Sequence, residues 1–244
     1  MIRKYVSNDF IQYLASTCDG GVGSTQLPSL TDLSQELGIS VASLREQVEV
    51  AKALGFVEVR PRTGIRRLPY TFLPAVQQSL SYAMEMDREY FDAFSELRNH
   101  VEAAYWFEAV ELLEPKDHIY LKDLLDSAWR KLRSPQIKIP HVEHRQLHMG
   151  IFKRLENLFV MGILEAYWDA YEAVGLNMYA GYDYLQQVWD YHQRMVDAIR
   201  SGDFETGYQA LVEHKDLLYH RSVSKLMGKD DSEVVSQSDM RETV

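Results

Sequence analysis

Residues 27–67 change from a helical to a strand-like pattern of hydrophobic positions. Leu33 and Leu37 lie four residues apart, as on the buried face of a first helix, and Leu44 and Val48 repeat that spacing farther along. Two short amphipathic helices are therefore expected here, with a different kind of element after them.

The residues between and after these helices predict a tight turn and a β-hairpin. Gly38 suits the left-handed end of the first helix, and Ser40 can cap the second. Residues 56–60 then alternate between hydrophobic and polar side chains, residues 61–63 form a turn, and residues 64–68 return as a second strand. This order of elements predicts a winged helix-turn-helix.

From about residue 71 onward the strand signals disappear and helical periodicity continues. The expected helices lie near residues 72–84, 87–113, 116–133, 141–156, 158–174, 180–200 and 203–226. The fold class is therefore mainly α, with an N-terminal winged helix-turn-helix, its small β-hairpin wing, and a C-terminal all-α helical bundle. We expect a winged helix-turn-helix domain over 1–70, a helical domain over 71–227, to which the family resemblance described below assigns effector binding and dimerisation, and a disordered tail over 228–244.

The exposed side of the second helix and the hairpin carry side chains that can reach phosphates and base edges in a DNA groove. These candidates for DNA contact are Ser43, Arg45, Gln47, Arg62, Thr63 and Arg66. The alternative is a winged helix used only for protein interaction, and the basic residues on the helix and the wing favour nucleic acid.

Four short motifs here resemble the N-terminal domain of the GntR family of bacterial transcription regulators. They are Leu27-Pro28-Ser29, Leu37-Gly38-Ile39-Ser40, Leu44-Arg45-Glu46 and the wing from Gly55 to Gly64. The chain departs from the family pattern at Leu30-Thr31, where Glu-Arg is usual, and at Val41, where a basic residue is usual. The resemblance implies DNA binding, without implying the sequence of the DNA site.

The distribution of charge confines any nucleic-acid surface to the N-terminal part. The formal net charge is −10, yet residues 1–70 hold eight Lys or Arg against seven Asp or Glu, whereas the remainder holds eighteen against twenty-nine. The acidic helical part is therefore a poor match for DNA.

Other sequence features favour a cytoplasmic protein. No hydrophobic run approaches the roughly 20 residues of a membrane span, and the first ten residues lack the hydrophobic core of a signal peptide. Cys18 is the single cysteine, so no intrachain disulfide can form.

Four histidines in the helical part have positions compatible with one transition-metal site. His144 and His148 are four residues apart on one predicted helix, and His192 and His214 lie on two later ones. Imidazole ligands suit zinc most, with nickel or iron also possible, and they discriminate against calcium and magnesium. Arg145 stands where an H-E-x-x-H protease has its glutamate, which argues against hydrolysis.

Residues 85–226 resemble the FCD effector domain of the FadR-type subfamily, in which a metal lies at the base of a pocket. The resemblance assigns the four histidines as metal ligands, with His144 where the family has an aspartate. Without that carboxylate the metal would keep its full double charge, which favours an anionic effector. The resemblance also places Arg98, in the segment Arg98-Asn99-His100-Val101-Glu102, across the pocket from the metal, where its guanidinium would bind the carboxylate of an effector. The alternative for Arg98 is an ordinary ion pair with Glu102.

These features predict a homodimeric, metal- and ligand-responsive transcription regulator that binds a palindromic operator, and not an enzyme. A small carboxylate would shift the helical domains and so the spacing of the recognition helices. One alternative keeps the regulator with a bulky effector among the aromatic residues and no metal. Another is a helical metalloenzyme with an accessory winged helix. His100, His118, His141 and His220 match no motif and are interpreted as surface residues or as residues that contact the metal ligands from behind.

Overall fold

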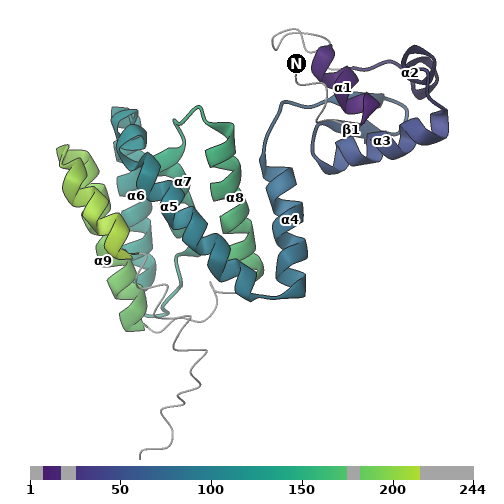
Figure 1. Cartoon of the computed structure of the whole chain (residues 1–244). Helices are drawn as coiled ribbons and strands as arrows, with labels where there is room; N and C mark the ends of the chain where they lie inside the picture. Colours follow the sequence, from purple (N-terminus) through teal and green to yellow (C-terminus); the bar gives the residue numbers. More distant parts are fainter. Residues whose placement is uncertain (1–7, 18–25, 175–181, 215–244) are drawn as a thin grey trace, which may run out of the picture. The chain divides into compact units, whose positions relative to one another are not determined.

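The computed structural model describes residues 8–17, 26–174 and 182–214 (Figure 1). These divide into two compact units, Met1–Phe91 with Leu155–Val174, and Asp92–Arg154 with Gly175–Val244. Cys18, His220 and the tail over 228–244 lie outside the described residues. The domain boundaries expected from the sequence stay predictions.

The first unit begins with three helices and a hairpin. The helices are α1 (Asp9–Ser16), α2 (Leu30–Leu37) and α3 (Val41–Ala53), followed by β1 (Val57–Arg60) and β2 (Gly64–Arg67). The sequence pattern did not reveal α1. Its Phe10 and Leu14 join a common core with hydrophobic residues of the other elements: Leu33, Leu44, Val48, Ala51, Val57 and Ile65.

The predicted turn and hairpin are confirmed in detail. Gly38 ends α2 with φ 68°, and the hydroxyl of Ser40 accepts a hydrogen bond from the Ser43 backbone N–H at 3.1 Å. The strands pair antiparallel, with Val57 opposite Arg67. The caps at this turn fix the direction of α3. They therefore also determine which face of α3 is exposed.

A pair of long helices completes the first unit. α4 (Leu73–Met86) packs against α8 (Leu158–Ala173), and the side chain of Asn157 caps α8 by accepting from the Phe159 and Val160 N–H groups. Gly162 permits this approach, because a Cβ there would meet the backbone nitrogen of Leu73 at 2.9 Å. The two helices are close enough that no larger residue fits at this position.

The second unit is an all-α bundle. Its helices are α5 (Glu89–Glu111, mostly within this unit), α6 (Pro115–Leu132), α7 (His141–Phe152), α9 (Tyr182–Ser201) and a further helix over residues 204–214. α6 packs against both α7 and α9. The mainly helical fold class expected from the sequence is confirmed, and the helix boundaries agree to within a few residues in the described part.

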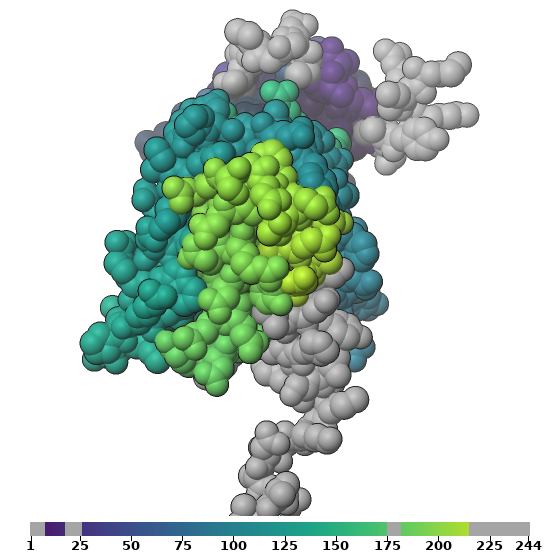
Figure 2. Space-filling view, turned by 90° about the vertical axis from the view of Figure 1, so that its left-hand side faces the viewer, coloured from purple at the N-terminus to yellow at the C-terminus, as the bar shows by residue number. Residues whose placement is uncertain are grey.

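The last described helix lies beside α9 on the face shown in Figure 2, where α9 is green and residues 204–214 are yellow-green. Arg194 and Glu213 form an ion pair of 2.9 Å between the two helices. On the α5 side, the Trp106 indole N–H donates to the Phe204 carbonyl at 2.9 Å. These contacts place His214 in the interior of the second unit.

No helix in the part of the chain that the structure describes combines the length and hydrophobicity needed to cross a membrane. This finding agrees with the absence of a long hydrophobic run in the sequence.

Candidate functional site

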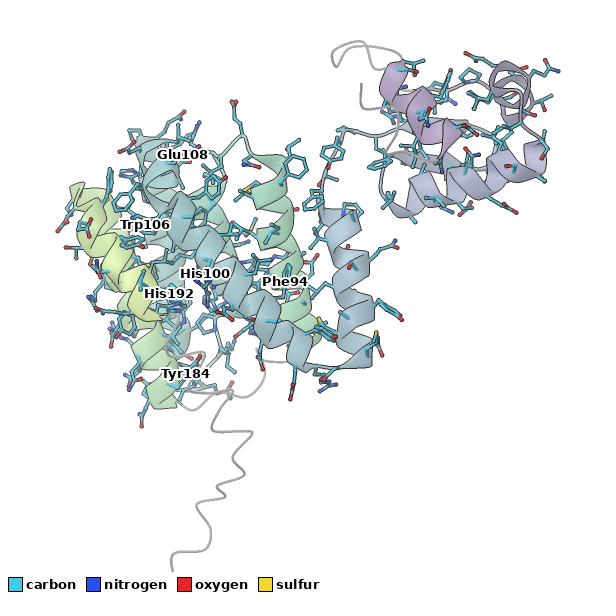
Figure 3. The ribbon with its side chains drawn as sticks, in the orientation of Figure 1. Phe94, His100, Trp106, Glu108, Tyr184 and His192 are labelled. Carbon is cyan, nitrogen blue, oxygen red and sulfur yellow. The ribbon has the colours of Figure 1, made fainter. Side chains whose placement is uncertain are left out.

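The four histidines predicted as metal ligands come together inside the second unit. α7 contributes His144 and His148, α9 contributes His192, and the 204–214 helix contributes His214. One nitrogen from each ring lies within 4.8 Å of one from every other ring. All four are buried, at 8%, 0%, 0% and 1% exposure, and Figure 3 labels His192 on α9. We call this set the histidine cluster.

The histidine cluster has the donor atoms that a transition-metal ion requires. The Nε2 atoms of His148 and His192 are 3.0 Å apart, and the ring centroids of His192 and His214 are 4.5 Å apart. The buried Nδ1 of His192 and Nε2 of His214 have no hydrogen-bond partner among the described residues. Buried polar atoms are normally satisfied, so these two nitrogens suit a bound cation.

The protein environment keeps the cluster uncharged. Burial lowers the pKa of all four imidazoles well below the usual value, and the neighbouring histidines and the Arg98 guanidinium lower the pKa of individual rings further. A neutral imidazole is the form that donates a lone pair to a metal. The cluster can therefore bind a metal ion.

Arg98 and Glu102 form a buried ion pair directly beside His148. Arg98 Nη2 lies 2.9 Å from Glu102 Oε1 and 3.0 Å from His148 Nδ1, and Glu102 Oε1 lies 3.2 Å from that same Nδ1. Burial raises the pKa of Glu102, and the charge of Arg98 opposes this rise. The i,i+4 pair expected as an alternative is present, but it is buried against the cluster and not on a solvated face.

A small cavity adjoins this pair. Its volume is about 10 Å³, and it is lined by Arg98, Asn99, Glu102, Leu211, Val212 and His214. Such a volume is close to the minimum that holds one water molecule. Any ligand larger than a water molecule would therefore require the lining side chains to move.

Charged contacts fix α7, which carries half of the cluster, at both of its ends. Near its start, Glu143 accepts hydrogen bonds from Ser127 at 2.9 Å and Lys131 at 2.7 Å on α6. Burial would raise the pKa of Glu143, but these hydrogen bonds outweigh it and keep that pKa below the usual value. Just past its end, Arg154 binds the buried Asp117 of α6.

The remaining histidines of the described part do not join the cluster. His100 is exposed and its Nδ1 lies 2.8 Å from the Glu96 carbonyl oxygen, while His118 is half-buried on α6 and His141 is exposed. The buried role of Glu102 was not anticipated. Its i,i+4 spacing from Arg98 was visible in the sequence, but that spacing alone does not distinguish a buried pair from a surface pair.

The candidates for DNA contact on α3 differ in how available their side chains are. Arg45 is exposed and Ser43 is half-buried. Gln47 is half-buried, and its Oε1 accepts a hydrogen bond from the Phe10 backbone N–H at 2.8 Å, while its Nε2 lies 3.4 Å from a carboxylate oxygen of Asp9. In this arrangement Gln47 ties α3 to the start of α1.

The wing candidates are all exposed. Arg62 lies at the tip with φ 69°, the Thr63 carbonyl accepts from the Gln26 side chain at 2.6 Å, and Arg66 lies 3.7 Å from Glu58. The contact to Gln26 holds the tip of the wing against the segment before α2. Arg62 and Arg66 can therefore extend from a fixed hairpin.

A winged helix-turn-helix together with a helical bundle that encloses a cluster of buried histidines is typical of a DNA-binding transcription regulator. The FCD domain family matches residues 93–217, which cover the whole cluster. The chain therefore belongs to the GntR family of transcription regulators, in the FadR-type subfamily that carries an FCD domain. It belongs with transcription regulators and not with enzymes, as the sequence predicted.

Two further comparisons agree with this assignment. A protein of Escherichia coli strain K12, "Putative L-lactate dehydrogenase operon regulatory protein", is 23% identical over 201 residues, covering 80% of this chain and 76% of its own length; a Shigella flexneri protein of the same name matches equally. The solved structure of a GntR protein of Streptococcus agalactiae has the same fold, with a TM-score of 0.64 at 16% identity over 88% of this chain and 97% of its own.

Proposed function

We propose that this protein is a metal-dependent regulator of transcription that responds to a small carboxylate in the cytoplasm. The histidine cluster is the observation that supports this proposal most strongly. Four neutral imidazoles buried together serve no evident packing need, since leucine or phenylalanine would fill the same space without the cost of burying polar atoms.

The proposed ligands of the metal are His144, His148, His192 and His214. Zinc is the first candidate for this all-nitrogen set, with nickel or iron as alternatives. When bound, the metal supplies a Lewis-acidic positive charge to which an oxygen of the effector can bind. Because no carboxylate stands among the four ligands, the cation would keep its full double charge, and an anionic effector is favoured.

Arg98 is the proposed second contact for the effector. Its guanidinium lies within hydrogen-bonding distance of a cluster histidine and is 2% exposed. A carboxylate could thus place one oxygen on the metal and receive hydrogen bonds from Arg98 on the other side. The Escherichia coli relative is named for an L-lactate dehydrogenase operon, which makes short 2-hydroxy acids sensible first probes.

For operator recognition we propose the exposed face of α3 together with the wing. Arg45 and Ser43 would reach base edges, Arg62, Thr63 and Arg66 would bind the DNA backbone, and Gln47 would contribute if its bonds to α1 permit. A single winged helix covers half of a palindrome, so the proposed active form is a homodimer joined through the helical part.

A bulky effector bound without metal is the weaker candidate. It would need space between aromatic side chains, and the described ones pack against each other, as Tyr167 and Trp168 do at a ring-centroid distance of 5.3 Å with exposures of 2% and 1%.

The direct experiment measures the binding of the full chain to an operator duplex selected from random sequence. Fluorescence anisotropy would be recorded with zinc or with a chelator, and with a series of small carboxylates including L-lactate. We expect at least one carboxylate to change operator affinity when zinc is present and to have no effect when zinc is chelated. We expect Arg98→Met to remove the response that is seen with zinc. A carboxylate response that persists fully in the chelated protein would refute the role of the metal.

A further inference from the structure

Two side chains lie close enough to His148 Nδ1 to compete for it: Arg98 forms a hydrogen bond with this nitrogen, whereas Glu102 lies near it without forming one. Arg98 Nη2 lies 3.0 Å from this nitrogen and Glu102 Oε1 lies 3.2 Å from it. A guanidinium only donates hydrogen bonds, and an ionised carboxylate only accepts them. Arg98 can therefore bond to Nδ1 only when that nitrogen carries no proton, and Glu102 only when it does.

These two bonds belong to the two neutral tautomers of His148. With Arg98 donating to Nδ1, the ring proton sits on Nε2 and points toward His192 Nε2, which is 3.0 Å away and can accept it. With Nδ1–H donating to Glu102, the lone pair of Nε2 points into the cluster. Only the second tautomer can ligate a metal through Nε2, since a protonated ring nitrogen has no lone pair to give.

When a metal is bound, the charges of the site also favour the tautomer in which Nδ1–H of His148 donates to Glu102. A divalent cation and the Arg98 guanidinium would place three positive charges among four neutral imidazoles, all of them buried. Glu102, which is 1% exposed and lies 2.9 Å from Arg98, carries a negative charge that offsets one of these positive charges. Carboxylates that accept a proton from a metal-ligating histidine commonly fix its tautomer and raise its basicity.

We propose that Arg98 and Glu102 form a tautomer switch on His148. With a metal bound at Nε2 of His148, the proton lost from Nε2 would be replaced by one on Nδ1, so the ring would stay neutral and Nδ1 would exchange its hydrogen bond from Arg98 for one to Glu102. The Arg98 guanidinium, no longer bonded to the ring, would then be able to bind the effector carboxylate. Binding would thus be ordered, with the metal first and the effector second. This inference rests on the metal site of the proposed function and adds a positioning role for Glu102, which touches neither metal nor effector.

The switch predicts metal affinities that change in opposite directions. Glu102→Gln removes the charge and weakens the acceptor, so zinc affinity should fall by about 10- to 100-fold. Arg98→Met removes both the competing donor and a positive charge, so zinc affinity should stay equal or rise by up to about tenfold. Glu108→Gln, an exposed glutamate labelled on the same helix in Figure 3, is the matched control and should leave it unchanged.

Competition titration of the full chain with a zinc chelator would measure these affinities, and circular dichroism would establish that each variant is folded. Nitrogen NMR of the imidazole rings would report the tautomer directly. The signals of His148 would be assigned as those that are missing from the spectrum of His148→Asn. We expect its proton on Nε2 before zinc is added and on Nδ1 afterwards.

Several outcomes would overturn the switch. If both variants weaken zinc binding equally, Arg98 and Glu102 form a structural pair only. If neither variant changes it, or if His148 keeps the same tautomer throughout, the proposal is wrong while the metal site stands. If the wild-type chain binds no zinc, nickel or iron, the metal part of the proposed function fails as well. Should Glu102→Gln not fold, Glu102→Asp with the NMR readout provides the same test.

Discussion

The histidine cluster makes the stability of the metal-free protein depend steeply on pH. Burial holds the pKa of His144, His148, His192 and His214 well below the usual value in the folded chain. In the unfolded chain each pKa returns to about 6.5. As pH falls below that value, the histidines of the unfolded chain bind protons and those of the folded chain do not, so the free energy of unfolding decreases.

The size of this effect follows from proton counting. Between about pH 7 and pH 5.5, each histidine that stays neutral in the fold costs about 1.3 kcal/mol of folding free energy, and four cost about 5 kcal/mol. Glu102 opposes this loss, because its raised pKa lets the folded state take up at most one proton. The net loss should therefore be about 3–5 kcal/mol, a large part of the stability of an ordinary domain.

Urea unfolding of the chelated protein across this pH range would measure the loss. His192→Gln should reduce it by about 1.3 kcal/mol, whereas the same change at the exposed His141 should leave it unaltered. Asp117 and Glu143, which are paired with basic residues, have lowered pKa values and titrate below this range. A wild-type loss under about 1 kcal/mol would refute the conclusion that the cluster is held neutral.

Three further predictions concern other parts of the chain. Arg45→Ala should weaken operator binding by about 1–3 kcal/mol and relax base preference in a titration; unchanged affinity and selectivity would transfer the reading role to Ser43 or Gln47. A fragment ending at Tyr70 keeps the core around Phe10 and should sediment as a monomer, so a dimer would contradict dimerisation through the helical part. Gly207→Ala would place a Cβ 2.6 Å from the Trp106 ring, and should lower the unfolding free energy by about 1–3 kcal/mol; an unchanged value would mean that the ring moves aside freely.

Sequence periodicity was sufficient to predict most of the elements, because amphipathic spacing and capping residues are local signals. Gly38 and Ser40 defined the turn of the helix-turn-helix, and the proline and glycine breaks separated the later helices. α1 was missed, since its eight residues carry few periodic positions and its N-terminus depends on Gln47, 37 residues away from Phe10. The close packing of α8 with α4 is likewise a long-range property.

The candidate site could be predicted in composition but not in detail. The i,i+4 spacing of His144 and His148 put both rings on one helix face, and the resemblance supplied His192 and His214. No local pattern indicates that Glu102 turns inward to contact His148, or that Glu143 and Asp117 fix α7 to α6. These contacts join residues from different helices, and only the packed bundle specifies them.

The proposed function depends most directly on the histidine cluster binding a metal. Elemental analysis of the purified full-length protein, after zinc, nickel or iron supplementation and removal of excess ion, tests this claim in one measurement. We predict close to one transition-metal ion per chain in the wild type and a loss of that metal in the double variant His148→Ala, His192→Ala. A wild type without metal under every supplementation, or a folded double variant that retains the metal, would contradict the proposed function.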